Sequence, residues 1–237
     1  MNKQIRKIRE SCLLSYLPNN EWDRLNPHLK NIYLPFGKTL CEANTNFNYI
    51  YFPITAIISL IYTTEDGQSS EIAITGNEGA VGVSLFMGGL STTSKAVVQS
   101  SGYCFQLSRN NLKDEFNLGG DVHHLLLKYT QALLTQTSQI SICNSHHTIN
   151  QRLCRWLLLY LDRNHGNTLD ITQESISELL GVRRSGINEA AIILQEAGII
   201  KYARGHITIN DRSALEDLSC ECYSVIKKEY KRLLPPN

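Results

Sequence analysis

The sequence predicts an α+β protein with an N-terminal antiparallel β-roll, a long central helix and a helix-rich C-terminal domain that contains one small hairpin. Three observations support this fold class. Short β-rich runs fill residues 30–108, the segment from Asp121 to about Asn144 has no Gly or Pro, and apolar residues recur at helical spacing beyond residue 149. We therefore place the domains at residues 1–120, 121–146 and 147–237.

The composition is that of an ordinary folded protein. Of the 237 residues, 42% are hydrophobic and 19% are charged, and the net charge is +1. No apolar run approaches the roughly 18–20 residues that span a bilayer. The first residues lack the cleavage site of a signal peptide, so we expect a cytoplasmic protein with no membrane partner. The chain is not strongly basic overall, so any contact with nucleic acid must come from a local patch.

The cysteines do not form a recognisable framework. Seven cysteines occur at irregular spacing, and an odd number argues against a set of disulfides. Only Cys220 and Cys222 lie close together in the sequence, which is a weak signal for a metal. We interpret them as free thiols and predict no metal site.

Turns divide the N-terminal half into short elements. Residues 3–28 predict two short helices, with a break near Pro18 and an end near Pro27. Strand-like runs at 48–64, 70–75 and 95–99 alternate with turns rich in Gly, Asn, Asp and Ser, a spacing typical of an antiparallel sandwich or roll. A short helix is predicted over 109–117.

The long central helix carries a regular stripe of apolar residues. Its members are separated alternately by four and three residues, the repeat of a coiled-coil seam. Such a stripe fits either a helix that lies against its own β-roll or a helix that pairs with a second chain, and we favour the dimer. The predicted interface residues are Val122, Leu126, Tyr129, Leu133, Gln136, Ile140 and Cys143.

Residues 171–209 predict a winged helix-turn-helix. Thr172 is a suitable N-cap for a first helix, Gly181 permits a tight turn, and a second helix runs from about Arg184 to Glu196. An ordinary pair of antiparallel helices would show similar spacing. The two short strands around Arg204, placed directly after the second helix, favour the winged form.

The polar face of the second helix predicts contact with double-stranded DNA. Arginine pairs with guanine, asparagine with adenine, and glutamate with the amino group of cytosine in the major groove. The start of the first helix suits a phosphate, and the hairpin could touch the flanking backbone. The candidate DNA-binding residues are Thr172, Gln173, Arg183, Arg184, Ser185, Asn188, Glu189, Arg204 and His206.

Over essentially its whole length the chain resembles the Crp/Fnr-type family of bacterial regulators. The most specific stretch runs from QRLCRWLLLYL (151–161) to RGHITI (204–209). The resemblance implies a β-roll of the cyclic-nucleotide-binding type that senses a small effector, a long dimerisation helix and a winged helix-turn-helix. It further implies a homodimeric transcription regulator that contacts DNA and RNA polymerase, with half-sites one helical turn apart, about 34 Å.

The effector region departs from the pattern of the members that bind cyclic AMP. Those members have a carboxylate for the ribose and an Arg for the cyclic phosphate, whereas here Ala80 stands at the carboxylate position. Lys95 is the only cation between residues 75 and 108, and it cannot reproduce the bidentate contacts of Arg. We therefore expect an effector other than cyclic AMP, of unknown identity. The candidate pocket residues are Gly79, Ala80, Val81, Gly82, Lys95, Thr137 and Ser138.

Other functions receive less support from the sequence. Only Cys12 and Cys41 precede residue 104, so the sequence does not match the iron–sulfur branch of the family, which needs a cysteine cluster near the N-terminus. The chain has no P-loop, nucleophile elbow, H-E-x-x-H motif or dinucleotide fingerprint, so we do not expect an enzyme. The main alternative is a cyclic-nucleotide-binding-like protein whose helix-turn-helix makes only protein–protein contacts. A steep salt dependence of duplex binding would distinguish the DNA regulator.

Overall fold

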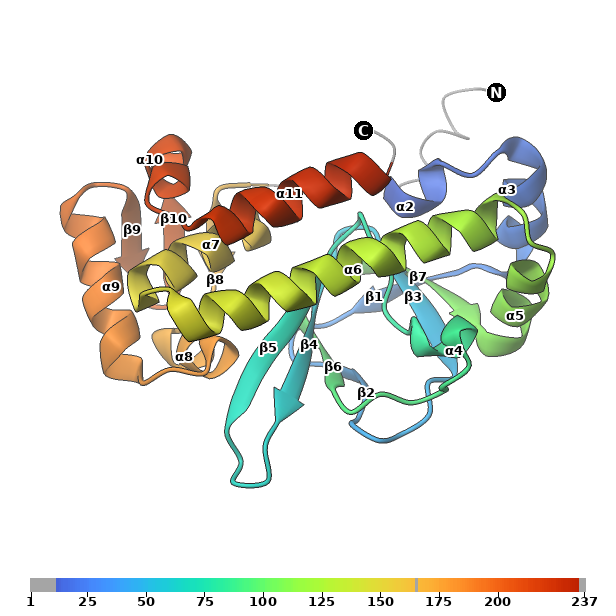
Figure 1. The fold of residues 1–237 in the computed structure, drawn as a ribbon, viewed down its shortest axis with the longest axis horizontal. Helices are drawn as coiled ribbons and strands as arrows, with labels where there is room; N and C mark the ends of the chain where they lie inside the picture. The colour runs from blue at the N-terminus through green and yellow to red at the C-terminus, as the bar shows by residue number, and fades with distance from the viewer. Residues whose placement is uncertain (1–11, 165, 235–237) are drawn as a thin grey trace.

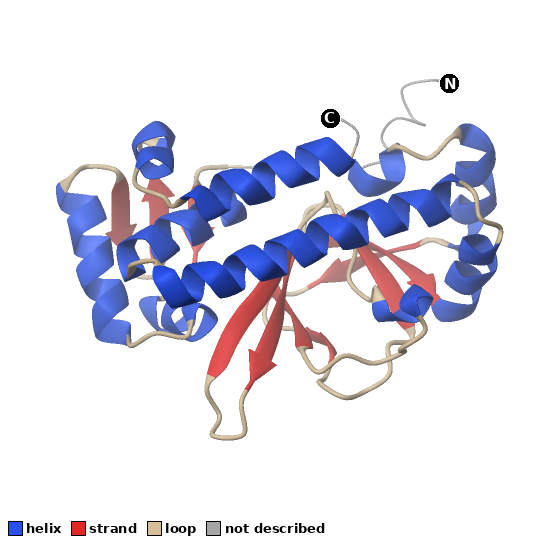
Figure 2. Ribbon diagram, viewed as in Figure 1, coloured by secondary structure: helices blue, strands red, loops and turns tan. Residues whose placement is uncertain are grey.

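The computed structural model describes residues 12–164 and 166–234. Figure 1 shows a β-roll at one end of an elongated molecule, the helix-turn-helix elements at the other end, and two helices, α6 and α11, that lie side by side across both. Figure 2 shows the strands of the roll beneath these helices. This is the predicted α+β architecture. Among the described residues, no helix combines the length and apolar character needed to cross a membrane.

Two antiparallel sheets form the roll. Their strands alternate in part between buried and exposed positions, which is the period-two pattern that predicted them. The first sheet has the order β1–β7–β3 and the second has the order β2–β6–β4–β5. The strands are β1 (Lys30–Leu34), β2 (Thr39–Cys41), β3 (Tyr49–Pro53), β4 (Ile57–Thr63), β5 (Ser69–Thr75), β6 (Lys95–Ser100) and β7 (Gly102–Ser108).

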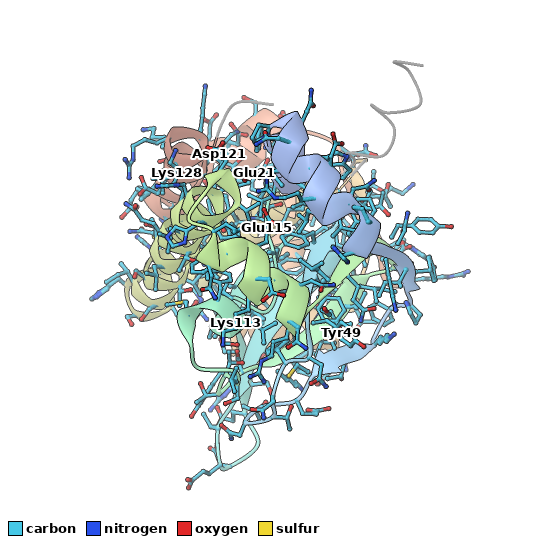
Figure 3. All side chains as sticks on the ribbon, turned by 90° about the vertical axis from the view of Figure 1, so that its right-hand side faces the viewer. Glu21, Tyr49, Lys113, Glu115, Asp121 and Lys128 are labelled. Carbon is cyan, nitrogen blue, oxygen red and sulfur yellow. The ribbon has the colours of Figure 1, made fainter. Side chains whose placement is uncertain are left out.

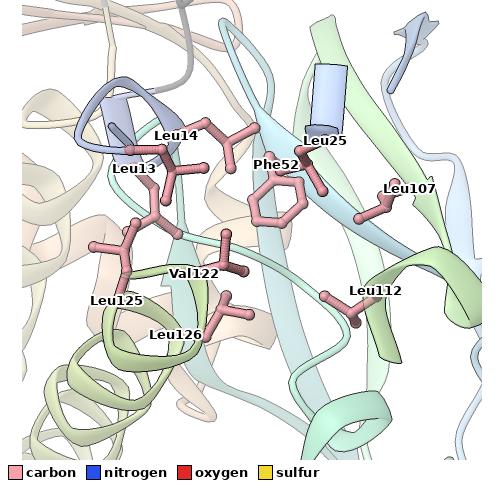
Figure 4. Close-up of a pocket in the computed structure, with 10 residues that line it drawn as sticks. Leu13, Leu14, Leu25, Phe52, Leu107, Leu112, Val122, Leu125 and Leu126 are labelled. Atoms are coloured by element: carbon pink, nitrogen blue, oxygen red, sulfur yellow. The ribbon is translucent and has the colours of Figure 1, made fainter. Parts of the chain in front are cut away.

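Short helices cover one end of the roll. They are α2 (Cys12–Ser15), α3 (Asn19–Leu25), the 3₁₀ helix η1 (Asn26–His28), α4 (Ser84–Met87) and α5 (Arg109–Asn117). The predicted break near Pro18 and the helix at 109–117 are both observed, while residues 3–11 lie outside the described part. Leucines of α2, α3 and α6 meet Phe52 around an apolar gap of about 10 Å³, which is too small for an effector (Figure 4).

A buried carboxylate fixes the start of the long helix α6 (Asp121–His146). Both oxygens of Glu21 accept hydrogen bonds from the first turn, at 2.9 Å from the Asp121 amide and 2.7 Å from the Val122 amide. Figure 3 shows Glu21 beside Asp121. An added Cβ on Gly120 would lie 2.2 Å from Glu21 Oε1, so a larger residue here would displace this carboxylate. An anionic side chain at this position satisfies the free amides and complements the helix dipole.

The predicted dimer seam on α6 lies inside a single chain, so the interpretation of these residues as a contact between chains is wrong. All seven have at most 8% of their surface exposed, and they pack against the roll and the C-terminal helix α11 (Glu221–Leu233). A three–four repeat identifies an apolar face but does not identify its partner. The corrected residues are Val122, Leu126, Tyr129, Leu133, Gln136, Ile140 and Cys143.

The polar member of that face explains why the helix stays within the chain. The Gln136 side chain accepts a hydrogen bond from the Ile74 amide of β5 at 2.9 Å and donates one to the Tyr230 hydroxyl of α11 at 2.7 Å. A buried amide must find such partners to offset its loss of water. Gln136 therefore joins three elements of one chain, α6, β5 and α11.

The C-terminal domain begins with α7 (Ile149–Leu161), whose start is fixed by a reciprocal capping box between Thr148 and Gln151. A three-stranded antiparallel sheet of order β8–β10–β9 supports the helix-turn-helix. Its first strand, β8, was not predicted from the sequence. The remaining elements are β8 (Thr168–Asp170), α8 (Gln173–Leu180), α9 (Arg184–Glu196), β9 (Ile200–Ala203), β10 (His206–Ile209) and α10 (Arg212–Asp217).

The apolar core of the C-terminal domain continues into the roll. Ile57 and Ile61 of β4 and Ile74 of β5 belong to the same buried cluster as the leucines of α7. A buried polar contact crosses the same boundary, where Trp156 Nε1 donates to Glu71 Oε1 at 3.0 Å and Ser59 donates to the other carboxylate oxygen. Burial raises the pKa of Glu71 to about 7, although both hydrogen bonds oppose this shift.

Candidate nucleic-acid interface

The turn between α8 and α9 has the geometry that its sequence predicts. Thr172 accepts a hydrogen bond from the Ser175 amide at 3.1 Å and so caps α8. Gly181 ends this helix with φ of 61°, in the left-handed region that a residue without a Cβ adopts most readily. Helix α9 then begins at Arg184, as predicted.

Gly186 allows α9 to approach α7. An added Cβ at this position would lie 2.6 Å from Ile149 Cδ1. The glycine therefore sets the distance between α7 and α9, while Ile187 and Leu194 bury the inner side of α9.

The outer face of α9 is open. All the candidate DNA-binding residues are exposed except Gln173, which is partly exposed, and together they lie on α9, at the start of α8 and on the β9–β10 hairpin. The structure thus brings the nine predicted residues to the surface of one small domain. Figure 1 places α9 at the end of the molecule furthest from α3 and α5, with no element across its outer side.

Two side-chain contacts join the first helix to the second. Gln173 Nε2 donates to Asn188 Oδ1 at 3.2 Å, and Arg184 Nη1 lies 3.5 Å from Glu174 Oε2. The Arg184 and Glu174 side chains are 67% and 58% exposed, so this ion pair contributes at most about 1 kcal/mol in water. The arginine can therefore leave its partner for a base or a phosphate at little cost.

The hairpin tip is a tight turn that presents a cation. Arg204 and Gly205 both have positive φ, 50° and 83°, which is the combination that a two-residue type I′ turn needs. At its base, His206 Nδ1 lies 2.6 Å from Asp170 Oδ1 on β8. Tyr202, which no sequence pattern indicated, accepts a hydrogen bond from the Gln173 amide at 3.0 Å and so holds the hairpin against α8.

The candidate effector residues are divided between different parts of the structure. Gly79, Ala80, Val81 and Gly82 are buried, and an added Cβ on Gly79 would lie 2.5 Å from the Tyr129 ring. The Tyr129 side chain therefore occupies the space directly beside this segment. The nearby Glu78 carboxylate pairs with Arg163 Nε at 2.7 Å, a contact between the roll and the end of α7 that sequence reasoning missed.

Lys95 lies in a separate cleft of about 210 Å³ between the roll and α8, which is lined in part by Ser175 and Glu178. The residues that line this cleft do not include the candidates on the segment 79–82 or on α6. Thr137 and Ser138 both donate their hydroxyl hydrogen bonds to backbone carbonyls of α6 itself, at 3.0 and 2.9 Å. Within the part of the chain that the structure describes, the candidates are thus spread over the segment 79–82, the cleft at Lys95 and α6.

Comparisons with known proteins agree with this arrangement. A family model described as a cyclic nucleotide-binding domain matches residues 32–117, and one described as a Crp-like helix-turn-helix domain matches residues 151–218. These two matches define a transcription regulator that joins a cyclic-nucleotide-binding-type roll to a helix-turn-helix. The chain belongs to the Crp/Fnr-type family of regulators. A search of curated proteins by sequence gives no match.

Several solved structures share the fold. A transcriptional regulator of the Crp/Fnr family from Eubacterium rectale is 17% identical, with a TM-score of 0.69 over 87% of this chain and 96% of the other. FixK2 from Bradyrhizobium japonicum is 17% identical, with a TM-score of 0.68 over 81% and 98%. The c-di-GMP responsive global regulator CLP from Xanthomonas campestris is 15% identical, with a TM-score of 0.64 over 82% and 100%.

Proposed function

We propose that this protein is a cytoplasmic transcription regulator that binds a specific sequence of double-stranded DNA as a homodimer and contacts RNA polymerase. The observation that carries the proposal is the exposed outer face of α9, which carries Arg184, Ser185 and Asn188. The start of α8 lies between this face and the hairpin tip, since Gln173 bonds to Asn188 and an added Cβ on Gly205 would lie 3.8 Å from Thr172. An α-helix fits the major groove, and these side chains can reach base edges there. The family implies the same use of the second helix.

The dimer in this proposal uses the other face of α6. Leu127, Leu134 and Ile142 are 46%, 61% and 49% exposed, and at helical spacing they lie nearly opposite the face that is buried in the chain. Gln131 and Ser138 fall between them on the same side. Large apolar side chains along one exposed stripe favour a second copy as the partner, because pairing removes them from water.

The effector in this proposal is a small molecule other than cyclic AMP. The segment 79–82 has no carboxylate, and Tyr129 packs directly against Gly79. The cation nearest in sequence, Lys95, faces the separate cleft against α8. The family members that bind cyclic AMP hold its ribose with a carboxylate and its phosphate with an arginine. The segment 79–82 provides neither group, so it cannot hold cyclic AMP in this way.

The DNA-binding function is tested by selecting duplexes from a random pool with the full-length protein, followed by affinity measurements at several salt concentrations. We expect a symmetric selected site with two half-sites about 34 Å apart. We also expect log K to fall linearly with log salt, since phosphate contacts release counterions. Weak, salt-insensitive binding to every duplex would instead favour the alternative in which the helix-turn-helix contacts only proteins.

Replacement of Arg184 by Ala tests the role of α9 in reading the sequence. We expect affinity for the selected site to fall by about 1–3 kcal/mol and discrimination to be lost at one base pair of each half-site. Lys228→Ala is the matched control. It also removes one exposed cation, but from α11, which is not part of the candidate DNA-binding face. An equal loss on all sequences would assign Arg184 to a phosphate rather than to a base.

A further inference from the structure

Four potential metal ligands meet where α6 ends and α11 begins. Cys143 lies in the last turn of α6, and His147 is the residue that ends this helix. Cys220 is the N-cap of α11, and Cys222 lies in its first turn. The three sulfur atoms and one imidazole nitrogen all lie within 4.8 Å of one another. The sequence spacing revealed only Cys220 and Cys222, because His147 lies 73 positions before Cys220.

We propose that these side chains bind a single zinc ion in a tetrahedral site: Cys143, His147, Cys220 and Cys222. The sequence predicted no metal, and the site is separate from the nucleic-acid interface and from the candidate effector residues. Zinc prefers sulfur and imidazole ligands, and closed sites with four protein ligands are structural rather than catalytic.

Two of the distances between ligand atoms are close to those around a single ion. A tetrahedral zinc with Zn–S bonds of about 2.3 Å and a Zn–N bond of about 2.0–2.1 Å holds its sulfurs about 3.8 Å apart, and a sulfur and the nitrogen about 3.5 Å apart. Here Cys143 Sγ lies 3.4 Å from Cys220 Sγ, and Cys222 Sγ lies 3.6 Å from His147 Nδ1. The sulfurs are too far apart for a disulfide bond, which has a length of about 2.05 Å.

The imidazole is oriented as a metal ligand would be. Its Nδ1 atom faces the sulfur atoms, while its Nε2 atom lies 3.3 Å from the Glu221 carboxylate. A metal-bound histidine commonly donates its second N–H to a carboxylate, which fixes the ring and raises the basicity of the ligating nitrogen. Only 15% of the His147 side chain is exposed, so bulk water does not compete strongly for this position.

A buried arginine provides an independent observation. Arg155 is 2% exposed, its charge acts on Cys143, and its Nε and Nη1 atoms have no hydrogen-bond partner among the described residues. Three thiolates with Zn²⁺ carry a formal charge of −1, which would balance this guanidinium.

The ion would join the sensor half of the chain to its last helix. Cys143 and Cys220 are fully or almost fully buried, and α11 runs from this point back along α6. The dipole at the N-terminus of α11 favours thiolates at Cys220 and Cys222. Metal binding would therefore set the angle at which α11 leaves the DNA-binding domain.

The test begins with metal analysis of the full-length protein, purified under reducing conditions without a chelator. We expect one zinc ion per chain, and we expect Co²⁺ added to the metal-free protein to give the visible bands of a tetrahedral site with thiolate ligands. Removal of zinc should lower the melting temperature. Because the cobalt spectrum uses the wild-type chain, it decides the question even where a variant fails to fold.

Variants assign the ligands. Cys222→Ser and His147→Ala should each lose stoichiometric zinc, whereas Cys104→Ser, which alters a buried thiol of strand β7, should keep it. Glu221→Ala should keep the stoichiometry but weaken zinc affinity by about 10–100-fold. Three results would each overturn the proposal: no zinc or cobalt binding by the folded protein, a Cys143–Cys220 disulfide found by mass spectrometry, or bound iron with the absorption of an iron–sulfur cluster.

Discussion

Replacement of Leu127 and Leu134 by Glu is expected to convert the protein into a monomer that still folds. Both side chains are largely exposed in the single chain, so a charge at these positions does not disturb the core. In a dimer, the same charges would lie opposite each other in an apolar contact and would repel. Sedimentation of the variant should give the mass of one chain.

The loss of the dimer should strongly weaken DNA binding, because two linked half-sites bind with higher apparent affinity than one. We expect a decrease of about 10²–10⁴-fold at a symmetric site. Leu118→Glu is the matched control, since this leucine is 65% exposed and follows α5 outside the stripe. A double variant that still sediments as a dimer would show that α6 does not form the interface. Leu133→Glu is not a useful test, because that residue is buried in the chain.

Replacement of Glu71 by Gln is expected to remove a pH-dependent loss of stability. Burial raises the pKa of Glu71 from 4.5 to about 7, so the folded protein keeps this proton at a pH where the unfolded chain has lost it. The resulting stabilisation is fully present below pH 4.5 and is lost as the pH rises to about 7. Above that pH the folded chain carries a buried carboxylate between the roll and α7.

The measurement is urea unfolding of both proteins from pH 5 to pH 8. Between these limits the wild type should lose about 2–3 kcal/mol relative to Glu71→Gln. The amide keeps an acceptor for Trp156 Nε1 and a group that can bond to Ser59, so the contact itself is retained. Glu65→Gln, in the exposed turn between β4 and β5, is the control and should leave the pH profile unchanged. Parallel profiles for wild type and Glu71→Gln would contradict a raised pKa.

The candidate DNA-binding residues could be located from the sequence because their signals are local. Thr172 caps the helix that follows it, Gly181 supplies the left-handed turn, and Arg204 with Gly205 makes the hairpin tip. Each of these features depends on residues a few positions away. No sequence pattern pointed to Tyr202, because its role depends on a hydrogen bond between its hydroxyl on β9 and the Gln173 amide on α8.

The long helix shows where a periodic pattern stops being informative. Its apolar repeat predicted a buried face, and that face is buried, but against β5 and α11 of the same chain rather than against a second copy. A hydrophobic stripe has the same pattern for either partner, since apolar contact has no direction. The exposed leucines on the other side are fewer and are mixed with polar residues, so they did not stand out.

The sequence by itself determined the order of roll, long helix and winged domain, and the chemistry of the surface that α9 presents. Those features follow from side-chain periodicity and turn residues, which act over a few positions. Only the tertiary structure decided the partner of α6, the pairing of Glu71 with Trp156, and the meeting of Cys143 and His147 with Cys220 and Cys222. These groups are tens of residues apart, and their proximity depends on how whole elements pack.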